Sequence, residues 1–171
     1  MDPILESLTD EQRSRLIQRL YERGEEIRQA LLEEAGNVLA EEDPEEIAED
    51  VFFALDMLEV ETLWDHSGPG REGYVSPDDQ ALNMIEEELE PFVSQVWQYL
   101  QLDMPTEAKK YMQGTLLGLY KFDRESSSQF RSWATDTPRE LFRSLLDKWR
   151  KKAKKPELIE EVNDFCLQRC P

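Results

Sequence analysis

Proline recurs at the start of four segments with helical hydrophobic spacing, and this recurrence constrains the fold more than any other feature. The four tetrapeptides are DPEE, SPDD, MPTE and TPRE, and their prolines are Pro44, Pro77, Pro105 and Pro138. Proline suits the first position of a helix because its missing N–H would have no partner there, and an acid soon after it faces the positive end of the helix dipole. Asp43, Ser76 and Thr137 are also good N-cap residues, whereas Met104 is not. Four helix starts are therefore predicted.

The four prolines lie 33, 28 and 33 residues apart. This spacing is close to the length of a helical-hairpin repeat such as the tetratricopeptide repeat. The side chains between the prolines are not clearly self-similar, so a TPR- or HEAT-like repeat and an irregular helical bundle both remain open. Apolar residues recur every three or four positions in about seven to eight segments, and no segment alternates as a strand does. We expect an all-α fold of seven to eight helices.

A chain of 171 residues can bury one hydrophobic core. We therefore predict a single all-helical domain over residues 1–171, with an N-terminal helical hairpin over 1–40 and proline-initiated helix pairs over 43–171. Thr9 and Gln12 have the spacing of a capping box at the start of a helix. Pro91 interrupts the apolar spacing that begins at Pro77 and should kink or divide that helix.

The charge is strongly negative and unevenly distributed. The net charge is −18, and residues 1–108 hold 29 acids against six arginines, whereas residues 109–171 hold nine acids and 14 bases. An acidic surface repels phosphate backbones, which disfavours nucleic acid as a partner of the whole chain. It favours a protein partner with a basic surface. The oligomeric state stays open.

One basic stretch, DKWRKKAKK, departs from this acidity. Its bases are Lys148, Arg150, Lys151, Lys152, Lys154 and Lys155. Bases around an aromatic residue, here Trp149, can bind single-stranded nucleic acid, so this candidate basic patch supports an alternative function as a nucleic-acid-associated module. The stretch is also the last turn of a helix before Pro156, where positive charge complements the helix dipole. We favour this structural interpretation.

The segment SGPGREGYV contains G-x-G-x-x-G at Gly68, Gly70 and Gly73. A dinucleotide-binding fingerprint needs a strand before it and a helix directly after it, and the pattern predicts neither. We expect a turn-rich connection between helices. As a long loop with the only histidine it is still our candidate recognition loop, with His66, Arg71 and Tyr74 as its residues. Packing of Trp64 and Tyr74 under neighbouring helices is the interpretation that we favour.

Two further pairs have helical spacing. Gly114 and Gly118 lie one turn apart, which predicts close approach of another helix within the chain rather than a dimer contact. Cys166 and Cys170, the only cysteines, are at best half of a zinc site. We expect no metal, no cofactor and no catalytic residues, because a single histidine in a loop makes no triad. The chain is predicted not to be an enzyme.

No apolar run approaches the ~20 residues of a membrane span, and the acidic start MDPILESLTDEQ is unlike a signal peptide. We therefore predict no membrane association. Two cysteines provide no disulfide framework, which fits a reducing compartment. The predicted location is the cytoplasm.

Several phrases resemble a known family. DPEEIAEDVFFALDMLEVETLWDHSG, GYVSP, EEELEPF and AKKYMQGTLLGLYKFD resemble the helical accessory region found beside SWIM-type zinc fingers in uncharacterised prokaryotic proteins, over roughly residues 43–135. The resemblance implies an all-helical, repeat-like module. The C-x-C…C-x-H finger itself is absent from this sequence, so no finger residue can be assigned. The function that we predict is a non-enzymatic helical scaffold or adaptor for protein–protein interaction.

Overall fold

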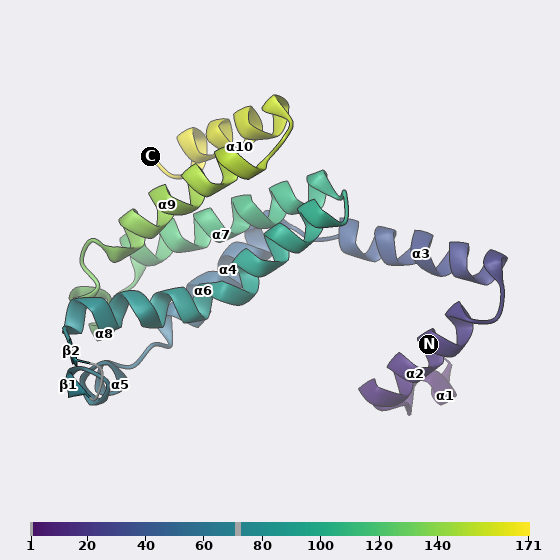
Figure 1. Ribbon diagram of the computed structural model, residues 1–171, viewed down its shortest axis with the longest axis horizontal. Helices are drawn as coiled ribbons and strands as arrows, with labels where there is room; N and C mark the ends of the chain where they lie inside the picture. Colours follow the sequence, from purple (N-terminus) through teal and green to yellow (C-terminus); the bar gives the residue numbers. More distant parts are fainter. Residues whose placement is uncertain (1, 71–72) are drawn as a thin grey trace. The chain divides into compact units, whose positions relative to one another are not determined.

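The structure is a computed structural model and describes residues 2–70 and 73–171. In these residues the chain forms ten helices and two short strands (Figure 1). The all-α class is confirmed, but the predicted count of seven to eight helices is wrong. Three pieces of four to six residues account for the difference, because apolar spacing does not resolve helices so short. They are α1 (Pro3–Glu6), α5 (Val60–Asp65) and α8 (Gln129–Trp133).

The chain divides into two compact units, Met1–Glu41 and Glu42–Pro171. The first unit consists of α1, α2 (Asp10–Tyr21) and α3 (Glu25–Ala40). The predicted capping box is present: the Gln12 amide donates to the Thr9 hydroxyl at 3.3 Å, and the Thr9 amide donates to the Gln12 side chain at 2.9 Å. None of these three helices has a buried residue. The stability of this unit therefore comes from local helical interactions rather than from a core.

The second unit is built around α7 (Pro105–Glu125). Four helices pack against α7, and Figure 1 shows three of them, α4, α6 and α9, lying beside it. The four are α4 (Pro44–Asp56), α6 (Pro77–Gln101), α9 (Thr137–Lys152) and α10 (Pro156–Arg169). Every residue of α7 from 114 to 119 is buried. This central helix receives apolar residues from all sides, including Leu55, Ile85 and Trp149, which are fully buried.

The close approach predicted for Gly114 and Gly118 is confirmed, and α4 is the helix that approaches. A β-carbon on Gly114 would lie 2.6 Å from the Ile47 β-carbon, and one on Gly118 would lie 2.6 Å from the Ala48 carbonyl oxygen. Real β-carbons do not come so near to other atoms. The two glycines therefore set the separation of α4 and α7, because only a residue without a side chain fits there.

The proline-initiated starts are confirmed with one correction. Asp43 caps α4 by accepting from the Glu45 amide at 2.9 Å, and the Ser76 hydroxyl caps α6 by accepting from the Asp79 amide at 3.1 Å. Thr137 is not an N-cap: α9 begins at Thr137 itself, after a residue without a side-chain capping bond. Pro91 lies inside α6 without dividing it.

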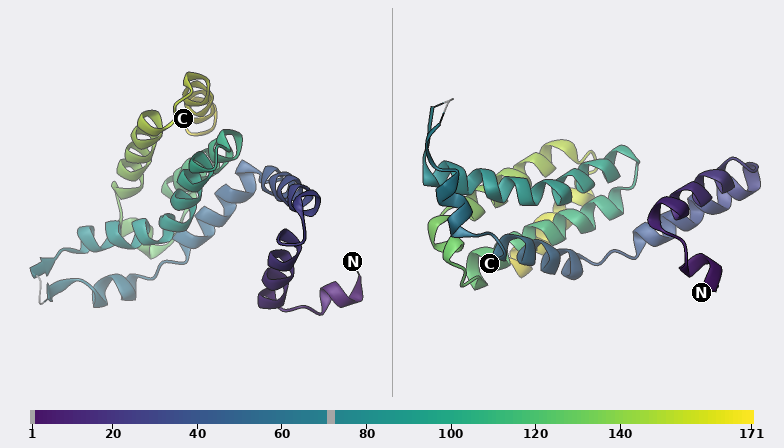
Figure 2. Two further views of the ribbon diagram at one scale, coloured as in Figure 1. Left: turned by 45° about the vertical axis from the view of Figure 1, so that its right-hand side comes forward. Right: turned by 90° about the horizontal axis from the view of Figure 1, so that it is seen from below.

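The glycine segment contains the two strands, although its sequence predicts no strand. β1 (Gly68–Gly70) and β2 (Gly73–Val75) pair antiparallel and follow α5 rather than leading directly into a helix. Figure 2 shows them extending away from the helices of their own unit. Gly68 has φ of 109°, a conformation that L side chains rarely adopt. Glycine therefore suits the start of β1, where Gly68 pairs with Val75.

Candidate functional site: an acidic surface on α6 facing α9

One exposed face of α6 is acidic. Glu86, Glu87 and Glu90 have the i, i+1, i+4 spacing that keeps side chains on one side of a helix, and all three are exposed. Together with Asn83, Gln80 and His66 they line an open hollow of about 540 Å³. We call Glu86, Glu87 and Glu90 the α6 acidic surface. It lies between the end of α5 and helix α9.

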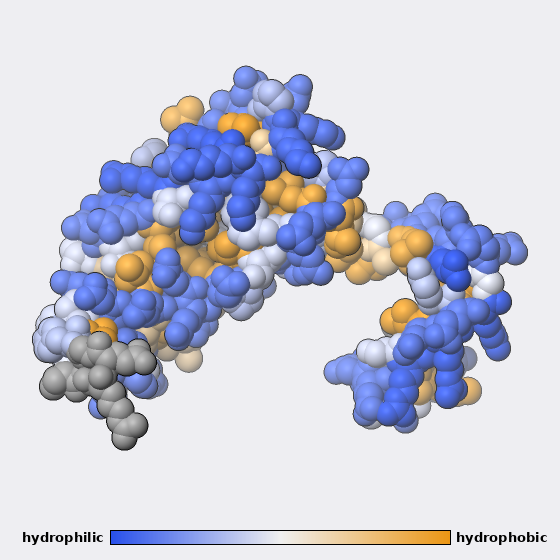
Figure 3. Space-filling model, viewed as in Figure 1, coloured by the Kyte–Doolittle hydropathy of each residue, from blue (hydrophilic) through white to orange (hydrophobic). Residues whose placement is uncertain are grey.

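Towards α9 the same surface becomes one wall of a groove. The groove has a volume of about 220 Å³, and α6 and α9 contribute matched i, i+3, i+4, i+7 faces to it. The lining residues are Glu86, Leu89, Glu90 and Val93 from α6 and Leu141, Ser144, Leu145 and Lys148 from α9. Figure 3 shows apolar atoms between the polar side chains that cover α6 and α9. The groove combines an apolar floor with charged walls.

The floor and the walls differ in how accessible they are. Leu89, Leu141 and Leu145 are buried, whereas Val93 and Ser144 are half-buried and form the accessible part of the floor. Among the described residues no ion pair joins Lys148 to the glutamates opposite, although all of them line one groove. Glu90 accepts a hydrogen bond from Ser94, its neighbour one turn later. The charges of both walls are thus available to a third group.

Of the candidate recognition loop, His66 lies beside the α6 acidic surface, and Tyr74 is not among the described residues that line the hollow there. His66 lines the hollow, and its Nδ1 lies 2.8 Å from the Thr62 carbonyl oxygen, to which it donates. Tyr74 is 70 % exposed, so the expected packing of Tyr74 under neighbouring helices is wrong. Trp64 is partly covered by an edge-to-face contact with Trp133. Arg71 lies outside the described residues.

The candidate basic patch does not behave as one surface. Arg150 donates to Asn163 and pairs with Asp147, and the Lys152 ammonium lies 4.1 Å from the centre of the Trp97 ring. Lys148 faces the groove. Lys151, Lys154 and Lys155 are exposed. Lys148 and Lys152 are also exposed and make no ion pair among the residues described, but Lys148 lines the groove and Lys152 lies over Trp97. Lys151, Lys154 and Lys155 are the bases of this stretch for which the described structure gives neither of these contacts.

The cysteines lie near the C-terminal end of α10, where Cys166 is buried and both thiols are free. A hydrogen bond between the two thiols lowers the pKa of Cys166, and the same bond raises the pKa of Cys170. In the part of the chain that the structure describes, no group of three or more histidine, cysteine or acidic side chains could hold a metal ion. Nor does any helix there combine the length and apolar character that crossing a membrane requires.

The sequence shows an acidic run at residues 86–90, but it did not identify these glutamates or the α9 wall as a site. Ser144 and Leu145 were not identified as site residues, because apolar spacing marks a buried face without showing which helix lies opposite. The signal that could have found the groove was the shared i, i+3, i+4, i+7 pattern of residues 86–93 and 141–148. That pattern becomes informative only once α6 and α9 are known to flank α7.

Comparison with family models, with curated proteins and with solved structures finds no match to this chain. The resemblance to the helical region beside SWIM-type zinc fingers therefore stays a prediction.

Proposed function

We propose that the protein is a non-enzymatic helical adaptor that binds a partner protein along the α6 acidic surface and the adjoining groove. The occupant is an amphipathic helix with lysine or arginine on the side that faces α6. One observation supports this above all: exposed glutamates and a lysine line opposite walls of one groove without pairing with each other. Helices commonly recognise amphipathic helices in such grooves.

The charges of the two walls suggest which side of the partner helix faces α6 and which faces α9. Basic side chains would pair with Glu86 and Glu90, and a carboxylate on the other flank would pair with Lys148. Small apolar residues between them would contact Val93 and Ser144. Because the walls are exposed, the attraction is screened by salt, and binding should weaken as ionic strength rises.

The proposal is tested by affinity capture from a nuclease-treated native lysate with three forms of the protein. They are the wild type, the double variant Glu86→Lys with Glu90→Lys, and the double variant Glu160→Lys with Asp164→Lys. The last pair lies exposed on α10 and changes the net charge by the same amount. A partner of the groove is captured by the wild type and the α10 variant at low salt and is lost from the α6 variant. Equal capture by all three forms would contradict the proposal.

A second candidate is a nucleic-acid-associated module that uses the basic stretch 148–155. The exposed positions of Lys151, Lys154 and Lys155 favour it. Reversal of these three charges should then abolish binding to a single-stranded oligonucleotide in a gel-shift assay. Weak binding that is unchanged by the reversal would remove this candidate.

A further inference from the structure

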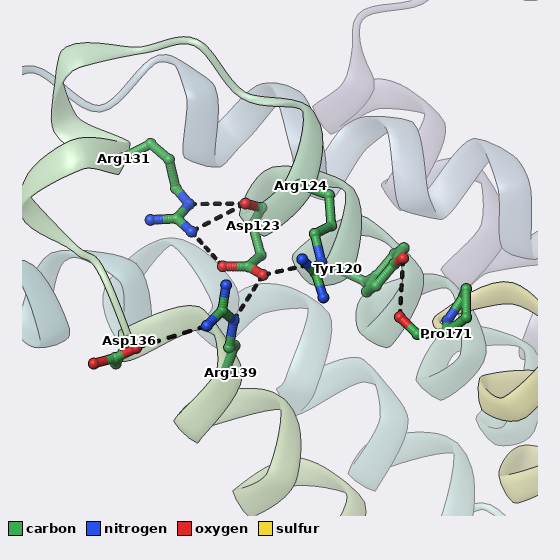
Figure 4. A network of polar contacts seen from close by, with 7 residues as sticks. All are labelled: Tyr120, Asp123, Arg124, Arg131, Asp136, Arg139 and Pro171. Atoms are coloured by element: carbon green, nitrogen blue, oxygen red, sulfur yellow. Dashed lines mark hydrogen bonds and ion pairs between the residues drawn. The ribbon is translucent and has the colours of Figure 1, made fainter.

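A buried carboxylate near the C-terminal end of α7 organises a cluster of arginines, shown in Figure 4. The Asp123 side chain is only 5 % exposed. Arg131 donates to the Asp123 main-chain oxygen from two nitrogens, at 3.1 and 3.0 Å, and also to its carboxylate. Arg139 donates from Nε to the other carboxylate oxygen at 3.0 Å. Both oxygens of Asp123 are therefore engaged.

Positive charge remains after Asp123 has been satisfied. Arg124 approaches the same carboxylate at 3.5 Å through Nε alone, and the second partner of Arg139, Asp136, is 3.8 Å away. Arg143 makes no ion pair or hydrogen bond with the residues that the structure describes. Terminal guanidinium N–H groups of these three arginines are thus left for another acceptor.

The three arginines border a hollow of about 150 Å³, and Asp123 is the one acidic side chain among the described residues that line it. Its other walls are largely apolar: Leu119 and Pro138 are buried, and Phe142 is half-buried. The end of α10 closes one side, where the Tyr120 hydroxyl donates to the Pro171 main-chain oxygen at 3.2 Å. A volume of about 150 Å³ has room for a molecule the size of benzene.

We propose that this hollow binds a small carboxylate that carries an apolar group about the size of a benzene ring. The apolar group packs on Leu119, Pro138 and Phe142, and the carboxylate accepts from Arg143 and Arg124. Arginine suits this role because its planar fork matches the two oxygens of a carboxylate. A free aromatic acid and the C-terminal residue of a peptide offer the same chemistry. The site is separate from the α6 groove, and either proposal can fail without the other.

The test is a titration of the ¹⁵N-labelled full chain with benzoate, followed by amide chemical shifts. Saturable shifts should appear around residues 119–124 and 138–143. Benzamide, which has the same shape without the charge, should bind about tenfold more weakly, since a hydrogen bond to a charged group is lost. Absence of saturable shifts in these two segments, or equal affinity for benzamide, would overturn the proposal.

Two variants remove the same charge from α9. Arg143→Gln should weaken benzoate binding about tenfold, whereas Lys151→Gln, which lies outside the hollow, should leave it unchanged. Equal affinity of Arg143→Gln and wild type would overturn the assignment of the site.

A short peptide ending in phenylalanine, with a free or an amidated C-terminus, distinguishes a peptide C-terminus from a small aromatic acid as the ligand. Tighter binding of the free form than of benzoate identifies a peptide C-terminus, and weaker binding identifies a small acid.

Discussion

Replacing Gly118 by alanine should destabilise the second unit, because the added methyl group has no room. The new β-carbon would lie 2.6 Å from the Ala48 carbonyl oxygen and 2.6 Å from the Val51 β-carbon, whereas ordinary contact begins at 3.4 Å. The helices α4 and α7 must separate by about 0.8 Å to accept it. A carbonyl oxygen belongs to the backbone and cannot rotate away as a flexible side chain can. A gap of this size forfeits a quarter to a half of the dispersion attraction across the interface.

The magnitude follows from two opposing effects. Overpacking costs roughly 1–3 kcal/mol, and the upper end applies here because α4 buries Val51 and Leu55 completely. Alanine is a better helix former than glycine by about 1 kcal/mol. The net loss in the free energy of unfolding is therefore about 2 kcal/mol, or roughly 4–8 °C in Tm.

Urea unfolding followed by far-UV circular dichroism measures this change as a lower midpoint with an unchanged slope. Gly36→Ala is the matched control, since Gly36 lies inside α3 and nothing stands within 4 Å of its added β-carbon. The control should be no less stable than the wild type. If Gly118→Ala were as stable as the control, α4 and α7 could not approach as closely as described.

Three further predictions concern the unfolding of the chain. Deletion of residues 1–41 should leave the urea midpoint of the main transition unchanged, because all the side chains that the structure describes as buried belong to the second unit. A lower midpoint would show that the two units unfold as one. Asp123→Asn should lower the free energy of unfolding in urea by about 2–4 kcal/mol, because it leaves buried arginine N–H groups without their charged acceptor. Asp136→Asn, at an exposed position, should lower it by under about 1 kcal/mol. Equal losses would refute the role of Asp123 as the centre of the arginine cluster. Burial raises the pKa of Tyr111 to about 12, so stability should fall as the pH rises from about 10 to 12, because the unfolded chain ionises first. Tyr111→Phe should flatten that fall, and an unchanged slope would contradict the assignment.

The helix starts could be predicted because their causes are local. Proline at the first position and a capping side chain act within one turn, as Asp43 and Ser76 show. The tight packing of Gly118 was also predictable, since a pair of glycines one turn apart has few other uses in an amphipathic helix. The partner helix α4 was not predictable, because only the tertiary fold selects which face meets it.

The site was less predictable for the same reason. The acidity of residues 86–90 is visible in the sequence, but its neighbour Lys148 was interpreted as part of a basic patch. Tertiary packing separates that patch: Lys152 covers Trp97 and Arg150 binds Asn163. The Asp123 cluster was missed altogether, since Arg131 and Arg139 reach it from 8 and 16 residues away. Such contacts leave no periodic signal in the sequence.

The most direct test of the adaptor proposal is photo-crosslinking from inside the groove. A photoreactive amino acid in place of Ser144, on the accessible floor, should give one covalent adduct with a polypeptide in native lysate after irradiation. The double variant Glu86→Lys with Glu90→Lys should abolish the adduct, and the double variant Glu160→Lys with Asp164→Lys should preserve it. An adduct that survives reversal of the α6 charges, or no polypeptide adduct at any salt concentration, would contradict the adaptor proposal.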